Sequence, residues 1–129
     1  MTAKVTHIFR HPIKALGREA LTDVRLTKGA TMPFDRVWAV AHEASNADNL
    51  VWSVCGNFIR AAKAPMLMAI TVRLDSTGQF VTLNHPNLAE ITLNPNRDGD
   101  ALVDWVAPLI PDDRAAPNRV VSVPGRGLT

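Results

Sequence analysis

The sequence predicts a mainly β fold: a small, partly closed antiparallel β-barrel with one short helix near the C-terminal end. Three observations support this fold class. Apolar and polar residues alternate with a period of two in several segments, which is typical of strands with one buried face. Turn-forming residues separate these segments, and nine prolines are spread along the chain. A helical pattern is found in one segment near the C-terminal end.

The alternating pattern predicts strands in order along the chain. Four of them are expected near residues 3–9, 20–27, 36–42 and 119–123. In the second of these, Val24 and Leu26 would be buried. Residues 66–93 predict a three-stranded antiparallel meander, with turns at residues 75–78 and 84–87. The first strand of the meander would bury alternate residues, namely Met68, Ile70, Val72 and Leu74.

Local composition characterises one of these strands further and predicts one helix. Residues 37–41 are almost all apolar, which suits a strand buried on both faces. Residues 99–107 predict a helix, and either Asp98 or Asp100 could cap its start. Pro108 would end this helix, because proline interrupts the ladder of helical hydrogen bonds.

Length and composition exclude several classes of protein. The chain has 129 residues, the size of one domain, and 47% hydrophobic residues, enough for its own core. Its 14 basic and 12 acidic residues leave a net charge of +2, which argues against a disordered polyelectrolyte and a strongly basic nucleic-acid-binding domain. No apolar run reaches the roughly 18 residues of a membrane span, and the N-terminus lacks a signal-peptide core. We therefore expect a cytoplasmic protein without a membrane contact.

Two segments suggest an anion site. Residues 11–17 read His-Pro-Ile-Lys-Ala-Leu-Gly, so a lysine lies in a bend after a strand. Residues 33–38 read Pro-Phe-Asp-Arg-Val-Trp, so an arginine opens the next buried strand. If Lys14 and Arg36 lie at neighbouring loop ends, they form a two-cation clamp. Arginine offers phosphate a planar fork, and lysine adds a point charge.

The spacing alone favours a simpler arrangement, because most charged side chains are solvated. Arg36 would then pair with Asp35 or Glu43, and Lys14 would face water. The four histidines show no metal-binding spacing, so we predict no metal site and expect them to be solvated or hydrogen-bonded. Cys55, the one cysteine, has no evident positive neighbour in the sequence, which favours a small buried hydrophobe over a nucleophile.

These segments resemble the N-terminal β-barrel domain of MOSC proteins, the molybdenum cofactor sulfurase C-terminal family. That domain carries Tyr-Pro-Ile-Lys-Ser and a glycine, which residues 11–17 match with His-Pro-Ile-Lys-Ala and a glycine. Its Asp-Arg-Arg-Trp motif is matched by Asp-Arg-Val-Trp at residues 35–38. Residues 64–67 are similar to its Pro-Arg-Leu segment, and the helix with Trp105 to its Trp-Leu helix. The resemblance covers nearly all of residues 4–123.

The resemblance implies an accessory N-terminal domain, residues 1–123, followed by a connector, residues 124–129, to an absent MOSC domain. In full-length relatives, which reduce N-hydroxylated compounds or transfer sulfur, the molybdenum cofactor (molybdopterin) lies between the two domains. The motif lysine and first motif arginine face its phosphate, which gives that role to Lys14 and Arg36, with Arg60 as a further candidate. The domain would help to enclose the cofactor and shape substrate access. Alone, it is expected neither to catalyse a reaction nor to hold the cofactor tightly.

The sequence departs from the family motifs at two positions. Ala15 replaces the family's serine, so one hydroxyl donor is missing, and Val37 replaces the second arginine of the motif. The cysteine that holds molybdenum in the family belongs to the MOSC domain, so the resemblance does not assign that role to Cys55.

Two alternatives come from other functional classes. The chain could be a free-standing small β-barrel that binds an anionic small molecule or a protein partner. A nucleic-acid binder would need aromatic stacking platforms, and a chain with no tyrosine and 5% aromatic residues argues against that role.

Overall fold

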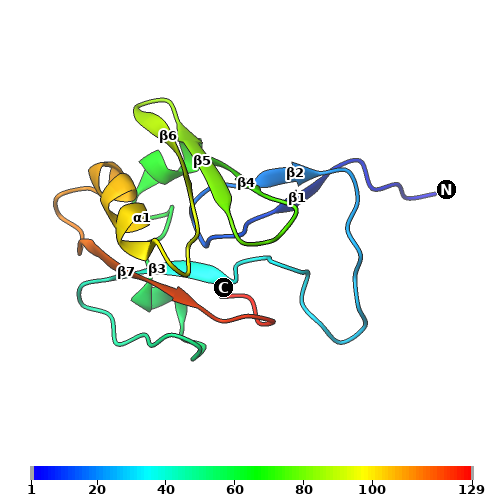
Figure 1. Ribbon diagram of the computed structural model, residues 1–129, viewed down its shortest axis with the longest axis horizontal. Coiled ribbons are helices and arrows are strands. Elements are labelled where there is room, and N and C mark those ends of the chain that lie inside the picture. Colours follow the sequence, from blue (N-terminus) through cyan, green and yellow to red (C-terminus); the bar gives the residue numbers. More distant parts are fainter. Residues whose placement is uncertain (1, 129) are drawn as a thin grey trace.

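The computed structural model describes residues 2–128 (Figure 1). Met1, the first residue of the expected domain 1–123, and Thr129, the last residue of the expected connector 124–129, lie outside the described residues. The regular elements follow in the order β1 (Ile8–Arg10), β2 (Glu19–Leu21), β3 (Trp38–His42), β4 (Thr71–Leu74), β5 (Val81–His85), β6 (Leu88–Leu93), α1 (Gly99–Val106) and β7 (Pro117–Ser122). Short 3-10 helices span Cys55–Asn57, Pro65–Ala69 and Ala107–Leu109. The fold is therefore mainly β with one short α-helix, as the sequence predicts.

The strands form three small open sheets rather than a barrel. Their orders are β1–β2, β3–β7 and β4–β5–β6, and all of the pairs are antiparallel. Single bridges link segments outside these ladders: Ile13 with Trp38, Arg18 with Thr71, and Ala41 with Phe58. Isolated bridges do not make the continuous ladder that closes a barrel. The partly closed barrel expected from the sequence is thus not confirmed in residues 2–128, because its strands are too short to pair all the way round.

The predicted meander is confirmed as β4–β5–β6, but its first strand starts later than expected. Residues 65–69 form a 3-10 helix instead, with Pro65 in its first turn and the Ile70 N–H donating to the Leu67 carbonyl. Met68, expected to be buried, is 77% exposed. Proline favours the first turn of a helix and cannot donate to a strand ladder, which explains the difference.

The second strand is also shorter than predicted. It pairs with β1 in a register that places Leu21 opposite Ile8, the first residue of β1. Beyond this point β2 has no partner backbone, so the strand ends and the chain enters a long loop. Leu26, expected on a buried face, is 67% exposed.

The predicted helix is confirmed as α1, which lies against β7 (Figure 1). Asp98 occupies the N-cap position, yet its carboxylate does not bond the helical N–H groups. It accepts instead from the Asn94 N–H, at 3.0 Å, and from the Arg97 guanidinium. These bonds lower the pKa of Asp98 to about 2. Asp98 therefore shapes the turn before the helix rather than capping its first turn.

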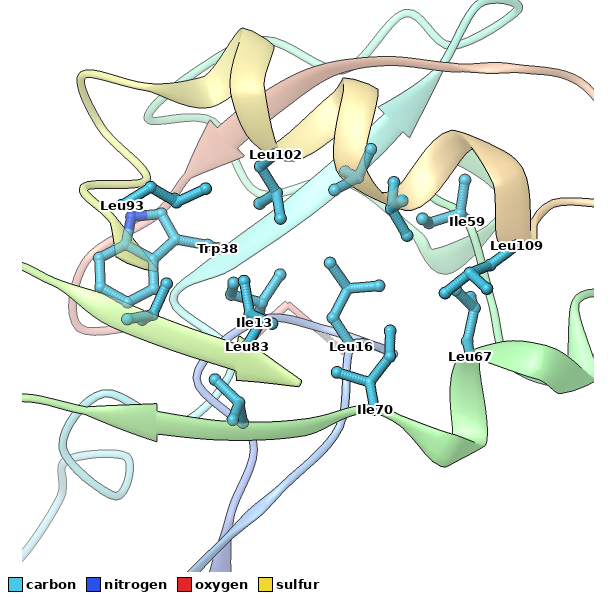
Figure 2. Close-up of a cluster of buried hydrophobic side chains, with 14 of the residues drawn as sticks. Ile13, Leu16, Trp38, Ile59, Leu67, Ile70, Leu83, Leu93, Leu102 and Leu109 are labelled. Carbon is cyan, nitrogen blue, oxygen red and sulfur yellow. The ribbon is translucent and has the colours of Figure 1, made fainter. Parts of the chain in front are cut away.

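β3 is the centre of the core, and both of its faces are buried as predicted. Trp38 and Val40 belong to the main cluster, while Ala39 and Ala41 belong to a second cluster on the opposite face. Figure 2 shows side chains of the main cluster converging from the helix, the strands and the 3-10 turns; those labelled are Ile13, Leu16, Trp38, Ile59, Leu67, Ile70, Leu83, Leu93, Leu102 and Leu109. Leu128, from the segment expected to be a connector, is fully buried in the second cluster.

Candidate functional site

Two segments converge along one edge of β3. The opposite edge of this strand pairs with β7. At the edge opposite β7, residues 12–14 run parallel to β3, and the Lys14 N–H donates to the Trp38 carbonyl at 2.8 Å. Residues 58–60 run antiparallel to β3, and the Ile59 N–H donates to the Val40 carbonyl at 3.0 Å. Because the two segments run toward each other, Lys14 and Arg60 are brought together although they are distant in sequence.

Asp35 holds the side chain of Arg36 at the same end of β3. Its Oδ1 accepts from the His11 N–H at 3.0 Å, which joins the lysine bend to the entry of β3. Its Oδ2 accepts from Arg36 Nε at 3.1 Å and Arg36 Nη2 at 2.8 Å. The alternative pairing of Arg36 with Asp35 is therefore confirmed. The Arg36 side chain is still 40% exposed, so this pairing leaves part of the guanidinium accessible.

Lys14, Arg36 and Arg60 form what we call the cationic cluster. Lys14 is half-buried rather than fully solvated. Burial lowers the pKa of Lys14 most, the Cys55 thiol beside it acts in the opposite direction, and the positive charges of Arg36 and Arg60 lower it further. Within residues 2–128, no carboxylate lies within 4 Å of Lys14 or Arg60. The three side chains thus create a local excess of positive charge, which suits an anion.

The chain matches one protein family, described as the MOSC N-terminal beta barrel domain, over residues 2–107. It belongs to this family. The matched range includes all three residues of the cationic cluster. No curated protein and no solved structure matches the chain. In the described part of this MOSC N-terminal domain, no helix is long and apolar enough to cross a membrane.

Cys55 lies beside the cationic cluster, which the sequence did not reveal. The Arg60 Nη1 lies 3.8 Å from the Cys55 Sγ. The thiol is also partly exposed, so the expectation of a buried hydrophobe is wrong. No pattern near Cys55 could show its electrostatic effect on Lys14, because the bend that carries this lysine lies far away in the sequence.

The histidines with the clearest contacts in this MOSC N-terminal domain have structural roles. His85 is buried, its Nε2 lies 3.0 Å from the Met66 carbonyl oxygen, and its Nδ1 accepts from a backbone N–H in the β5–β6 turn. The Nε2 of His42 lies 2.7 Å from the Gly56 carbonyl oxygen. Residues 2–128 contain no group of three or more His, Cys, Asp or Glu side chains placed to hold a metal ion.

The arrangement predicts that Lys14 titrates below its ordinary pKa of 10.5. The pKa of Lys14 is lower in the folded state than in the unfolded state. At pH values between these two pKa values, the unfolded state therefore binds more protons, and the free energy of unfolding should rise as the pH increases through this range. Replacing Arg60 by glutamine should raise the pKa of Lys14 by removing one repelling charge. NMR titration of 13C-labelled lysine side chains measures this shift. Arg25→Gln, in the exposed loop after β2, should leave it unchanged; equal effects of both substitutions would contradict the prediction.

Proposed function

We propose that this chain is the accessory N-terminal domain of a MOSC-type, molybdenum-cofactor-dependent protein. It helps to enclose the molybdopterin cofactor and shapes substrate access, and it does not catalyse a reaction alone. The observation that carries the proposal is the cationic cluster, formed at the edge of β3 opposite β7 in a chain that belongs to the MOSC N-terminal family. The cofactor's phosphate is the group that this cluster would bind.

The residues present fit a phosphate in charge and in donor type. Lys14 is held where its ammonium form is disfavoured, so a nearby anion would stabilise that form. Arg36 is oriented by Asp35 and presents a planar guanidinium that can still donate to phosphate oxygens. Ala15, with a φ of 65° in the bend after Lys14, provides no hydroxyl donor. We therefore expect weaker binding than a serine at this position would allow.

The proposed work of this chain is binding and orientation. Lys14 and Arg60 would balance the phosphate charge, and Asp35 would keep the Arg36 fork in place. The cofactor, when bound, would supply the redox chemistry of molybdenum. Because a phosphate lies at one end of this cofactor, holding it would set the position of the whole group relative to the partner domain.

Isothermal titration calorimetry of this chain with isolated molybdopterin-type cofactor tests the proposal. The double variant Lys14→Ala/Arg36→Ala should bind at least about tenfold more weakly, because two charge-assisted contacts are lost. The control is Arg25→Ala/Lys28→Ala, which removes the same charge from the exposed loop after β2. Equal binding by both double variants would contradict the proposal. Binding of inorganic phosphate without the cofactor would favour a free-standing anion-binding module.

A further inference from the structure

A separate cavity lies between two segments that are distant in the sequence. One wall is formed by His42 and by residues between 56 and 64, a segment that begins within the Cys55–Asn57 turn, and the other wall by residues between 110 and 115, which follow α1 and its 3-10 turn. The cavity has a volume of about 130 Å³. Of the cationic cluster, only Arg60 lines the cavity. The cavity therefore lies beside the site proposed for the phosphate and does not include Lys14 or Arg36.

The inner part of the cavity is apolar, and backbone hydrogen bonds fix its wall. Phe58, Ile59 and Ala64 are buried and contribute to it, together with the partly buried Ile110. The Ile59 N–H is bonded to β3, and the Ala64 N–H donates to the Arg60 carbonyl at 3.0 Å. These bonds fix the wall without any ligand. An apolar group that entered the cavity would therefore meet a preformed surface.

The polar part of the lining carries positive charge only. Arg60, Lys63 and Arg114 line the cavity, and no acidic residue does so. Lys63 and Arg114 are exposed. Neither has a carboxylate within 4 Å in residues 2–128, although Asp113 precedes Arg114 in the sequence. Positive groups beside a low-dielectric wall attract an anion more strongly than the same groups on a flat surface.

We propose that this cavity binds a small organic carboxylate. Its carboxylate would lie between Lys63 and Arg114, and its short apolar body would pack on Phe58 and Ile110. Sites for drug-sized ligands commonly have about 300–1,000 Å³, so a cavity of about 130 Å³ excludes a nucleotide or a pterin and suits an acid of a few carbons. Arginine pairs with a carboxylate through two parallel hydrogen bonds, which adds direction to the attraction.

NMR titration of the 15N-labelled chain with butyrate tests this proposal. Butyrate should give saturable shifts in residues 56–64 and 110–115, with a dissociation constant on the order of millimolar. Butyramide, which has the same shape and no charge, should give no saturable shift. Inorganic phosphate should bind more weakly than butyrate, because it cannot use the apolar wall.

Two double variants complete the test. Lys63→Gln/Arg114→Gln should weaken butyrate binding at least about tenfold, while Arg25→Gln/Lys28→Gln should leave it unchanged. The proposal would be overturned if both double variants lost butyrate binding or if neither did. It would also be overturned if butyramide gave the same shifts as butyrate, or if inorganic phosphate bound with the same affinity as butyrate. Arg60 is left unchanged because it also belongs to the cationic cluster. Lys14→Ala/Arg36→Ala should retain butyrate binding, so failure of this proposal is distinguishable from failure of the cofactor role.

Discussion

Replacing Gly17 by alanine is expected to lower the free energy of unfolding by about 2–5 kcal/mol, the sum of a backbone cost and a packing cost. Gly17 has a φ of 81°, which an L side chain rarely adopts. An added Cβ would overlap the carbonyl oxygen of Ile70 and lie 2.8 Å from its carbonyl carbon. The obstacle is backbone in the core, so a side-chain rotation cannot relieve it. Urea denaturation measures the loss.

Gly29→Ala is the matched control for this substitution. Gly29 has nearly the same φ, 78°, but nothing lies within 4 Å of the position of its Cβ. Its substitution should therefore cost only the backbone part, about 1–2 kcal/mol. The difference between the two variants isolates the close approach of residue 17 to Ile70. Equal losses would show that this approach relaxes without cost.

Replacing Glu19 by alanine is the second large effect, with an expected loss of about 3–5 kcal/mol. Glu19 is 8% exposed on β2, its Oε1 accepts from Arg10 Nε at 2.7 Å, and the same oxygen lies 2.7 Å from Arg10 Nη2 in an ion pair. Its Oε2 accepts from the Leu74 N–H at 3.0 Å. The substitution would leave a mostly buried guanidinium without its partner and a buried N–H without an acceptor. Chemical denaturation of the variant measures this effect.

Two comparisons make the Glu19 prediction specific. Glu90→Ala removes an exposed carboxylate from β6 and should change stability by less than about 0.5 kcal/mol. The double variant Arg10→Met/Glu19→Leu removes both charges and should recover the part of the loss that comes from the unpaired guanidinium, because apolar residues of similar size often replace a buried ion pair without cost. The Leu74 N–H would still lack its acceptor. If Glu19→Ala were as stable as Glu90→Ala, this would contradict the conclusion that the Glu19 carboxylate stabilises the contact between β2 and β4.

Both sensitive positions support the candidate site. Residues 17–19 dock the lysine bend against β4: Arg18 bridges to Thr71, and the Arg18 carbonyl accepts from the Val72 N–H. The bend reaches β3 through the hydrogen bond of the Lys14 N–H. Lys14 is thus held between two sheets, which gives the cationic cluster a defined geometry before any ligand binds.

The sequence by itself determined the features that depend on neighbouring residues. Almost continuous apolar character predicted that residues 37–41 would be buried on both faces, and proline and aspartate positions predicted the bounds of α1. The motifs around Lys14 and Arg36 pointed to the family and to these cations. Periodicity and turn chemistry express whether each residue faces the core or water, and that preference is local.

The tertiary structure alone decided the features that depend on residues far apart. It ended β2 where β1 begins and left the sheets open. It also brought Arg60 and Cys55 near Lys14 along the edge of β3 opposite β7. Strand closure and charge clusters depend on which distant backbones meet, and a local pattern carries no information about that register. For this reason the candidate residues were readable from the sequence, but their arrangement was not.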